Sequence, residues 1–456
     1  MFKHNTLAVA VAAMTLSPTL SFAADGSDLQ SIRNEIDALR QNYESRISDL
    51  EARLKKAEVA TVVAPASTPY VETSNAPVPA STAAGSGFNP DVSLILSGLY
   101  TNLSRKPEDY RIAGFIPGGE IGPGARGFSL SESELGFSAN IDHLFYGQAN
   151  LAVSPQNEIS AEEAFIQTTA LPAGLKIKAG RFFSSIGYLN DQHSHTWDFV
   201  DNPLVYQAFL GTQFSHDGVQ LKWLAPTDTF IELGAEAGRG SNFPGSEVNR
   251  NGAGAQALFA HIGGDIGVSN SWRVGLSYLH ATPKGRDYAE TDALGNSVTN
   301  SFSGGSRLIG ADFIWKWAPN GNGERQNFKL QGEYFRRKEA GDLTYDTAVT
   351  AHSDRYTSSQ SGWYVQGVFQ FMPAWRVGLR YDLLDSGVVD YGSNAANLAS
   401  VDYRPARTSL MFDWSPSEFS RVRLQLARDK SRQGAADNQL FLQYQMSLGA
   451  HGAHSY

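Results

Sequence analysis

Apolar and polar side chains alternate along most of the chain after about residue 89. In one such segment, Val422 and Leu424 alternate with Arg421 and Arg423. A period of two indicates β-strands that present one apolar face and one polar face. Sixteen segments of this kind predict strands at residues 91–103, 127–140, 143–154, 157–170, 174–182, 217–224, 228–239, 254–266, 271–282, 305–317, 325–337, 361–372, 374–385, 403–414, 419–430 and 438–449.

The polar face of these strands carries Arg, Asp, Gln and Gly. In residues 374–385, Trp375 and Leu379 point to one side, whereas Arg376 and Arg380 point to the other. This arrangement fits a transmembrane barrel that has lipid outside and a wet lumen inside. A soluble β-sandwich alternates in the same way, so the period by itself leaves both folds open.

The lengths of the connections separate the two folds. Every other link is short, at 141–142, 171–174, 225–227, 267–270, 318–324, 373 and 415–418. Most of the links between them are long, at 104–126, 183–216, 240–253, 283–304, 338–360 and 386–402. Outer-membrane barrels alternate short periplasmic turns with long extracellular loops in this way, and an even strand number puts both barrel ends on the periplasmic side.

Tryptophan placement supports the same interpretation. Six of the eight tryptophans flank predicted short turns: Trp223, Trp272, Trp315, Trp317, Trp375 and Trp414. An aromatic girdle at one membrane interface explains this clustering, because indole is apolar in its body and polar at one edge. We therefore predict an all-β fold over residues 89–456, a transmembrane antiparallel β-barrel of about 16 strands.

The N-terminus predicts export. Lys3 and His4 precede an apolar stretch at residues 7–16, and Ser21 and Ala23 are small residues at a cleavage site. This pattern is typical of a secretory signal peptide, predicted at residues 1–23, because the apolar core is too short to span a bilayer. The expected location is the outer membrane of a Gram-negative cell.

Residues 25–57 are predicted to form a short α-helical coiled coil in the periplasm. From Leu29 to Ala57 the apolar residues are spaced 3.5 apart on average, with charged residues between them. A helix this polar can bury its apolar stripe only by self-association. The alternative is a single helix exposed to solvent. Residues 58–88, rich in Ala, Pro, Ser and Thr, are expected to form an extended linker.

Composition removes several classes of function. The chain has 37 basic and 46 acidic residues, which argues against nucleic-acid binding, and it has no cysteine, which removes disulfides and thiolate chemistry. G-x-S-x-G, H-E-x-x-H and P-loop motifs are absent from the sequence. Residues 122–127 match G-x-G-x-x-G but open no predicted helix. We therefore expect neither an enzyme nor a cofactor.

An exported coiled coil, a proline-rich tether and a sixteen-strand barrel together resemble the porins. The barrel is most similar to the phosphate-selective porins, and the coiled-coil arm resembles that of sucrose-type porins. The resemblance implies homotrimers in outer-membrane lipid, passive diffusion of small hydrophilic solutes or ions, and a third extracellular loop that narrows the lumen. That loop is 183–216, and its candidate constriction residues are Asp191, His193, His195, Asp198 and Asp201.

Basic residues on the lumen side are candidates for a charge filter, because cationic rings attract anions. They are Lys176, Lys178, Arg376, Arg380, Arg421 and Arg423, together with Arg181 at a strand end. The phosphate-selective resemblance implies such a ladder. The acidic residues of the third loop oppose it, so the sign of the preferred ion stays open.

Two further functions stay open. His193 and His195, with Asp191 and Asp198 nearby, offer imidazole and carboxylate ligands for Zn²⁺ or a similar cation, so a metal-uptake channel is one alternative. His451 and His454 could form a second such site. The other alternative is a structural tether in which the coiled coil binds peptidoglycan and the barrel serves as an anchor.

Overall fold

The structure, a computed structural model, describes residues 90–119 and 121–449. Several predictions concern segments outside the described residues: the signal peptide at 1–23, the coiled coil at 25–57, the linker at 58–88, and the terminal residues His451 and His454. The described residues cover the predicted barrel except for residues 89, 120 and 450–456.

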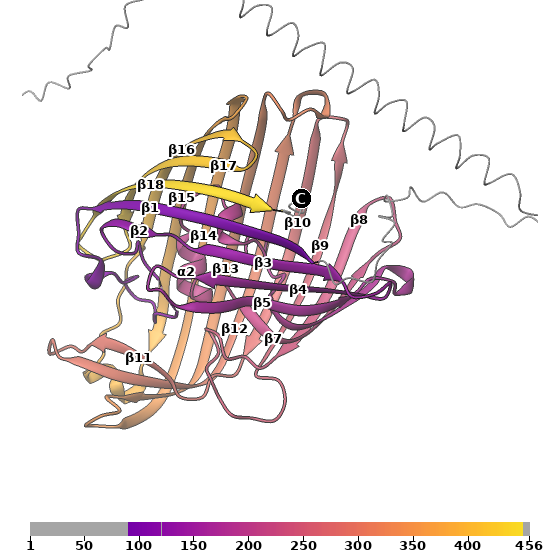
Figure 1. Cartoon of the computed structure of the whole chain (residues 1–456). Coiled ribbons are helices and arrows are strands. Elements are labelled where there is room, and N and C mark those ends of the chain that lie inside the picture. The colour runs from indigo at the N-terminus through magenta and orange to yellow at the C-terminus, as the bar shows by residue number, and fades with distance from the viewer. Residues whose placement is uncertain (1–89, 120, 450–456) are drawn as a thin grey trace, which may run out of the picture. The chain divides into compact units, whose positions relative to one another are not determined.

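The described chain forms one closed antiparallel sheet (Figure 1). Its strand segments are β1 Asp91–Leu103, β2 Gly127–Leu130, β3 Ser133–Asn140, β4 Phe145–Val153, β5 Ile159–Thr168, β6 Leu175–Phe183, β7 Ser215–Leu224, β8 Phe230–Gly238, β9 Ala255–Ile266, β10 Asn270–Ala281, β11 Arg286–Thr291, β12 Ser297–Trp317, β13 Asn327–Tyr345, β14 His352–Met372, β15 Trp375–Asp390, β16 Ala406–Ser417, β17 Ser420–Lys430 and β18 Asp437–Gly449. The helices are short: α2 Leu204–Leu210 and the 3₁₀ turns η1 Pro107–Asp109, η2 Pro172–Gly174, η3 Ser194–Thr196, η4 Pro319–Gly321 and η5 Gly392–Ala396.

These eighteen segments make sixteen strands, because two strands are each interrupted once. β2 and β3 both pair with β1, and β10 and β11 both pair with β12. The first and last strands close the ring, with Ser93 opposite Gly449. The predicted sixteen-strand antiparallel barrel is therefore confirmed.

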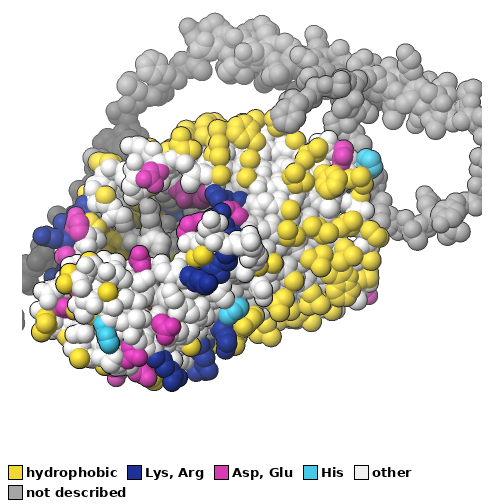
Figure 2. All heavy atoms as spheres, turned by 90° about the horizontal axis from the view of Figure 1, so that it is seen from below, with side chains coloured by type: hydrophobic (Ala, Val, Ile, Leu, Met, Phe, Trp, Pro, Cys, Tyr) yellow, Lys and Arg dark blue, Asp and Glu magenta, His cyan; other side chains and the backbone are white. Residues whose placement is uncertain are grey.

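Alternation along each strand separates an apolar outer wall from a polar lumen. On β10, Leu276 is 66% exposed on the outside, while the adjacent Ser277 is 6% exposed inside. On β18, Leu442 and Tyr444 face outward, while Gln443 is buried inside. Figure 2 shows hydrophobic side chains over the outer wall and charged ones gathered around a hollow. Among the described residues, no helix has the length and apolarity needed to cross a membrane.

The predicted short turns and long loops lie at opposite ends of the strands. We call these the short-turn end, which includes 141–144 and 373–374, and the long-loop end, which includes 104–126 and 184–214. Both ends of the ring, at Asp91 and Gly449, lie at the short-turn end. Trp375 and Trp414 stack there at a centroid distance of 5.8 Å.

The predicted long loops at 283–304 and 338–360 were wrong, as was part of 386–402. β11 and β12 continue through the first stretch, β13 and β14 through the second, and β15 runs on to Asp390. These extensions lie beyond the band of apolar side chains on the outer wall. Their outer faces are polar, so the sequence there does not show a clear alternation of apolar and polar residues. Their inner faces form a small core of their own that includes Phe302 and Leu343, both fully buried.

The fold predicts that an added charge is costly on the outer wall and tolerated in the lumen. Leu379→Arg places a guanidinium on the outward face of β15 and should lower the free energy of unfolding by about 2–4 kcal/mol. The control is Gln167→Arg, which faces the water-filled lumen from β5 and should have little effect. Denaturant unfolding in lipid vesicles measures both; equal losses would contradict the assignment of faces.

Candidate functional site

The connection between β6 and β7, residues 184–214, lies inside the barrel, where α2 is seen within the ring of strands (Figure 1). The sequence predicted that the loop at 183–216 narrows the lumen, and the observed connection lies within those bounds. Its backbone donates hydrogen bonds to three lumen-facing strands: Gly187 N to Ser277 Oγ at 2.9 Å, Leu204 N to Asp382 Oδ1 at 2.9 Å, and Val200 N to Gln425 Oε1 at 2.8 Å. We call this segment the inner loop.

The inner loop carries its own apolar anchor, the helix α2. All seven residues of α2 are buried, and Gly211 ends the helix in the left-handed conformation with φ 64°. Tyr206 packs edge-on against Phe335 of β13 at 5.3 Å, and its hydroxyl donates to Glu333 Oε2 at 2.8 Å. Burial of this helix excludes water from one side of the lumen and fixes where the rest of the loop runs.

Asp198 holds the inner loop to the barrel through two cations. Its carboxylate lies 2.6 Å from Lys329 Nζ and 3.2 Å from Arg376 Nη1, and it accepts a hydrogen bond from Gln366. Burial alone would raise the pKa of Asp198, but Lys329 and Arg376 outweigh burial and lower the pKa to about 2. The carboxylate is therefore ionised at neutral pH.

Asp201 makes a second ion-pair anchor. It lies 2.6 Å from Arg380 Nη2 and 2.7 Å from Arg407 Nη1, and Gln425 donates to it at 2.9 Å. Burial raises the pKa of Asp201, yet Arg407 and Arg380 lower it further, to about 2. Two of the three predicted constriction aspartates, Asp198 and Asp201, are thus paired with cations of the barrel wall.

The predicted basic residues lie in different environments. Arg376 and Arg421 line an open cavity, whereas Arg380 and Arg423 are each 1% exposed and covered by the inner loop. Arg421 Nη2 donates to the carbonyl of His195 at 2.6 Å, and Arg423 donates to the carbonyl of Trp197. These arginines therefore hold the loop as well as charging the lumen.

Lys178 also lines the cavity, with its ammonium 4.2 Å from the ring centroid of Phe165. Lys176 has the same parity on β6 but is exposed and is not part of the cavity lining. The prediction for Arg181 was wrong. It shares the outward face of Ile177 and pairs with Asp217 of β7 at 2.6 Å, because alternation continues to the end of the strand.

A cavity of about 990 Å³ lies between the inner loop and the short-turn end. Cations line part of its wall: Lys178, Lys222, Lys316, Lys329, Arg376 and Arg421. Carboxylates line another part: Asp91, Glu134, Glu163, Asp191 and Glu418. The sequence interpretation missed Lys222, Lys329, Glu134 and Glu163, although their lumen parity on predicted strands could have identified them.

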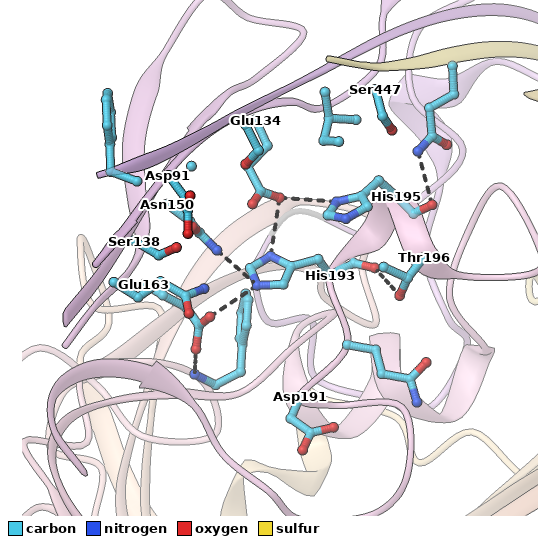
Figure 3. A pocket seen from close by; sticks show the side chains of 18 of the residues that line it. Asp91, Glu134, Ser138, Asn150, Glu163, Asp191, His193, His195, Thr196 and Ser447 are labelled. Carbon is cyan, nitrogen blue, oxygen red and sulfur yellow. Dashed lines mark hydrogen bonds and ion pairs between the residues drawn. The ribbon is translucent and has the colours of Figure 1, made fainter. Parts of the chain in front are cut away.

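His193 and His195 lie at one side of this cavity, against carboxylates of β3 and β5 (Figure 3). His193 Nδ1 and His195 Nδ1 lie 3.2 Å and 3.1 Å from the same oxygen, Glu134 Oε2. His193 Nε2 lies 3.0 Å from Glu163 Oε2. Burial lowers the pKa of His193, but the carboxylates around it dominate and hold the pKa well above its ordinary value.

Asp191, in contrast, is exposed on the inner loop. It lines the cavity together with His193 and His195 but does not belong to the group of potential metal-binding donors around Glu134. Asp198 also lies apart from that group, paired with Lys329 and Arg376. The structure thus brings the two histidines together and separates them from the aspartates expected to join them.

Comparison with solved structures shows that this chain shares its β-barrel fold with an outer-membrane protein. The trimer form of OmpT, an outer-membrane protein of Vibrio cholerae, superposes with a TM-score of 0.50 over 79% of this chain and 99% of its own, at 11% identity. OprB of Pseudomonas putida has a TM-score of 0.47 at 14% identity, over 79% and 94% of the two chains. An anion-selective porin from Comamonas acidovorans has a TM-score of 0.46 at 9% identity, over 79% and 99%. At these identities the likeness concerns the fold.

At the level of sequence, the chain belongs to the same family as an uncharacterized protein of Aquifex aeolicus (strain VF5). The two are 30% identical over 398 residues, which span 81% of this chain and 80% of the relative. No protein-family model matches the chain. The similarity to the phosphate-selective porins therefore stays a prediction.

Loss of one anchoring charge should destabilise the protein. Asp201→Asn leaves Arg380 and Arg407 buried with less compensation, and we expect a loss of about 3 kcal/mol in unfolding free energy, with Asp382 still facing both arginines. The matched control is Asp191→Asn on the same loop, which should change stability by less than about 0.5 kcal/mol. Denaturant unfolding in detergent measures both, and similar values for the two variants would contradict the anchor.

The anchor should also show a defined pH dependence. The pKa of Asp201 falls from an ordinary value of 3.8 to about 2, so its contribution to stability is complete above the ordinary value. The stability difference between the wild type and Asp201→Asn should stay constant at higher pH and shrink as pH falls toward 2. Unfolding midpoints across this range test it; a difference that already declines near neutral pH would contradict it.

Proposed function

We propose that this protein is an outer-membrane porin through which small hydrophilic solutes and ions diffuse passively. The observation that carries the proposal is the charged cavity of about 990 Å³ inside a closed barrel, narrowed by the inner loop. A barrel that served only as an anchor would have no need of a polar cavity. The lining of lysines, arginines and carboxylates is the chemistry of a hydrated passage.

The cavity should impose a transverse electric field on a passing solute. Asp198 and Asp201 are paired with wall cations, Lys329 and Arg376 among them, so the field arises from the net balance of the cations and carboxylates that line the cavity. Lys316 lies directly opposite Lys329 in the sheet register. Both line the cavity and add positive charge to its wall.

The same geometry bears on the phosphate-selective resemblance. Arg380 and Arg423, two members of the expected ladder, are covered by the inner loop and paired or hydrogen-bonded within the protein. Lysines contribute most of the positive charge that the cavity exposes. We therefore propose a passage of general specificity rather than a phosphate channel.

We further propose a homotrimer in outer-membrane lipid, with the short-turn end in the periplasm. The coiled coil predicted at residues 25–57 would then lie in the periplasm, where it could also contact peptidoglycan. Support comes from the alternation of turns with loops and from the common position of both ends of the ring at the short-turn end.

Conductance tests the passage directly. Purified protein in a planar lipid bilayer should show ohmic openings, grouped in three equal steps if the trimer is correct. Closed, non-conducting insertions would contradict the porin and favour the tether alternative. A pull-down with peptidoglycan that depends on residues 25–57 would support that alternative.

Ion selectivity tests the field. Lys178→Gln removes one positive charge from the cavity, so reversal potentials in asymmetric KCl should shift toward cation preference. Lys176→Gln, on the same strand but outside the cavity lining, is the matched control and should produce a smaller shift. Equal shifts in the two variants would contradict the position assigned to the field.

A further inference from the structure

We propose that Glu134, His193 and His195 form a binding site for a divalent transition-metal cation such as Zn²⁺ in the wall of the lumen. One residue comes from β3 and two come from the inner loop, and all three line the cavity (Figure 3). Their donor atoms lie within 4.8 Å of one another. The site would join the inner loop to the barrel wall.

The distances match those between ligands of a tetrahedral centre. With ligand bonds of about 2.0–2.1 Å, two ligands of a tetrahedral Zn²⁺ lie about 3.3 Å apart. The distances from Glu134 Oε2 to His193 Nδ1 and His195 Nδ1 are 3.2 Å and 3.1 Å. Glu134 is buried, and its Oε2 lies close to both nitrogens, so one cation could bind all three atoms.

The groups around the second ring nitrogen of His193 also fit a metal site. A metal-bound histidine commonly donates its second ring nitrogen to a carboxylate, which orients the ring. His193 Nε2 lies 3.0 Å from Glu163 Oε2, and the side chain of Asn150 lies 3.1 Å from the same nitrogen. Phe183 packs edge-on against the His193 ring at 5.4 Å and limits its rotation.

The fourth position has a candidate ligand. Glu162 Oε2 lies 3.4 Å from His193 Nδ1, again close to the distance between two ligands of one centre. Alternatively, water from the cavity could complete the shell. Three carboxylates, Glu134, Glu162 and Glu163, thus lie against the two imidazoles. This excess of negative charge suits a divalent cation.

The choice of metal follows from the donor types. Two imidazoles and a carboxylate favour Zn²⁺, Cu²⁺, Ni²⁺ or Co²⁺, whereas Ca²⁺ and Mg²⁺ require shells built mainly of oxygen. Expected binding is therefore one Zn²⁺ or Co²⁺ per chain, with Ca²⁺ as a negative control. Bound Co²⁺ should show the intense visible absorption of tetrahedral coordination.

The test uses the full chain in detergent, with His451 and His454 replaced by alanine because they could bind metal themselves. Calorimetric titration with Zn²⁺ should show one site per chain. Loss of an outer contact weakens metal affinity by up to about 100-fold, so loss of a direct ligand in His195→Ala or Glu134→Gln should weaken Zn²⁺ affinity by more than that. Glu163→Gln should weaken it by about 10- to 100-fold. Asp191→Asn, a matched exposed acid on the same loop, should leave it unchanged. Circular dichroism checks that each variant is folded.

Two results would overturn the site: no Zn²⁺ bound by the background protein, or undiminished binding in both His195→Ala and Glu134→Gln. An octahedral Co²⁺ spectrum would overturn the three-ligand geometry. The inference does not rest on the proposed pore. A channel that conducts but binds no Zn²⁺ removes only the metal site, and a protein that binds Zn²⁺ but does not conduct removes only the pore.

Discussion

A barrel wall in lipid has to satisfy its own backbone, and this constraint explains most of the molecule. Hydrocarbon offers no hydrogen-bond partner, so each strand pairs on both sides and the last strand returns to the first, with Ser93 opposite Gly449. A closed wall then forces successive side chains to face lipid and lumen in turn. Sixteen strands enclose a lumen too wide for their own side chains to fill. The inner loop occupies part of that space, and its charges find partners there.

The inner loop shows how a wide lumen can hold ions away from bulk water. Asp198 and Asp201 enter as carboxylates, and cations of the wall meet them. Such pairs recover the cost of desolvation only when geometry and additional hydrogen bonds are good, and both aspartates accept a further bond from a glutamine. These ion pairs fix the inner loop to the wall, and they also neutralise the negative charges of Asp198 and Asp201. In the proposed passage, the remaining lysines and carboxylates would act on solutes.

Much of the fold could be predicted from the sequence, because the membrane imposes a strict period on it. β1 was predicted residue for residue at 91–103. β12 was predicted only from residue 305, although it begins at Ser297, because beyond the apolar belt water covers the outer face and the contrast between the faces disappears. Strand ends that pack against one another outside the membrane do not need an apolar outer face, so their sequences show a weaker period of two.

The candidate site was less predictable. Length and composition identified the inner loop, and parity identified Arg376 and Arg380 as lumen residues. Parity does not say which strand a loop residue meets, so the partners of His193 were missed. The structure supplies them from strands β3 and β5, which come early in the chain, whereas the arginine strands β15 and β17 come late. A pairing of this kind depends on the path of the loop, which no periodicity encodes.

The enclosed position of the inner loop constrains the order in which the protein assembles. Asp201 pairs with Arg380 across 179 residues of sequence, so its partner strand is made long after the loop itself. The ion pairs of Asp201 with Arg380 and Arg407 can therefore form only when β15 and β16 are present. Until then these pairs cannot hold the inner loop, so its final position depends on strands that follow it in the chain.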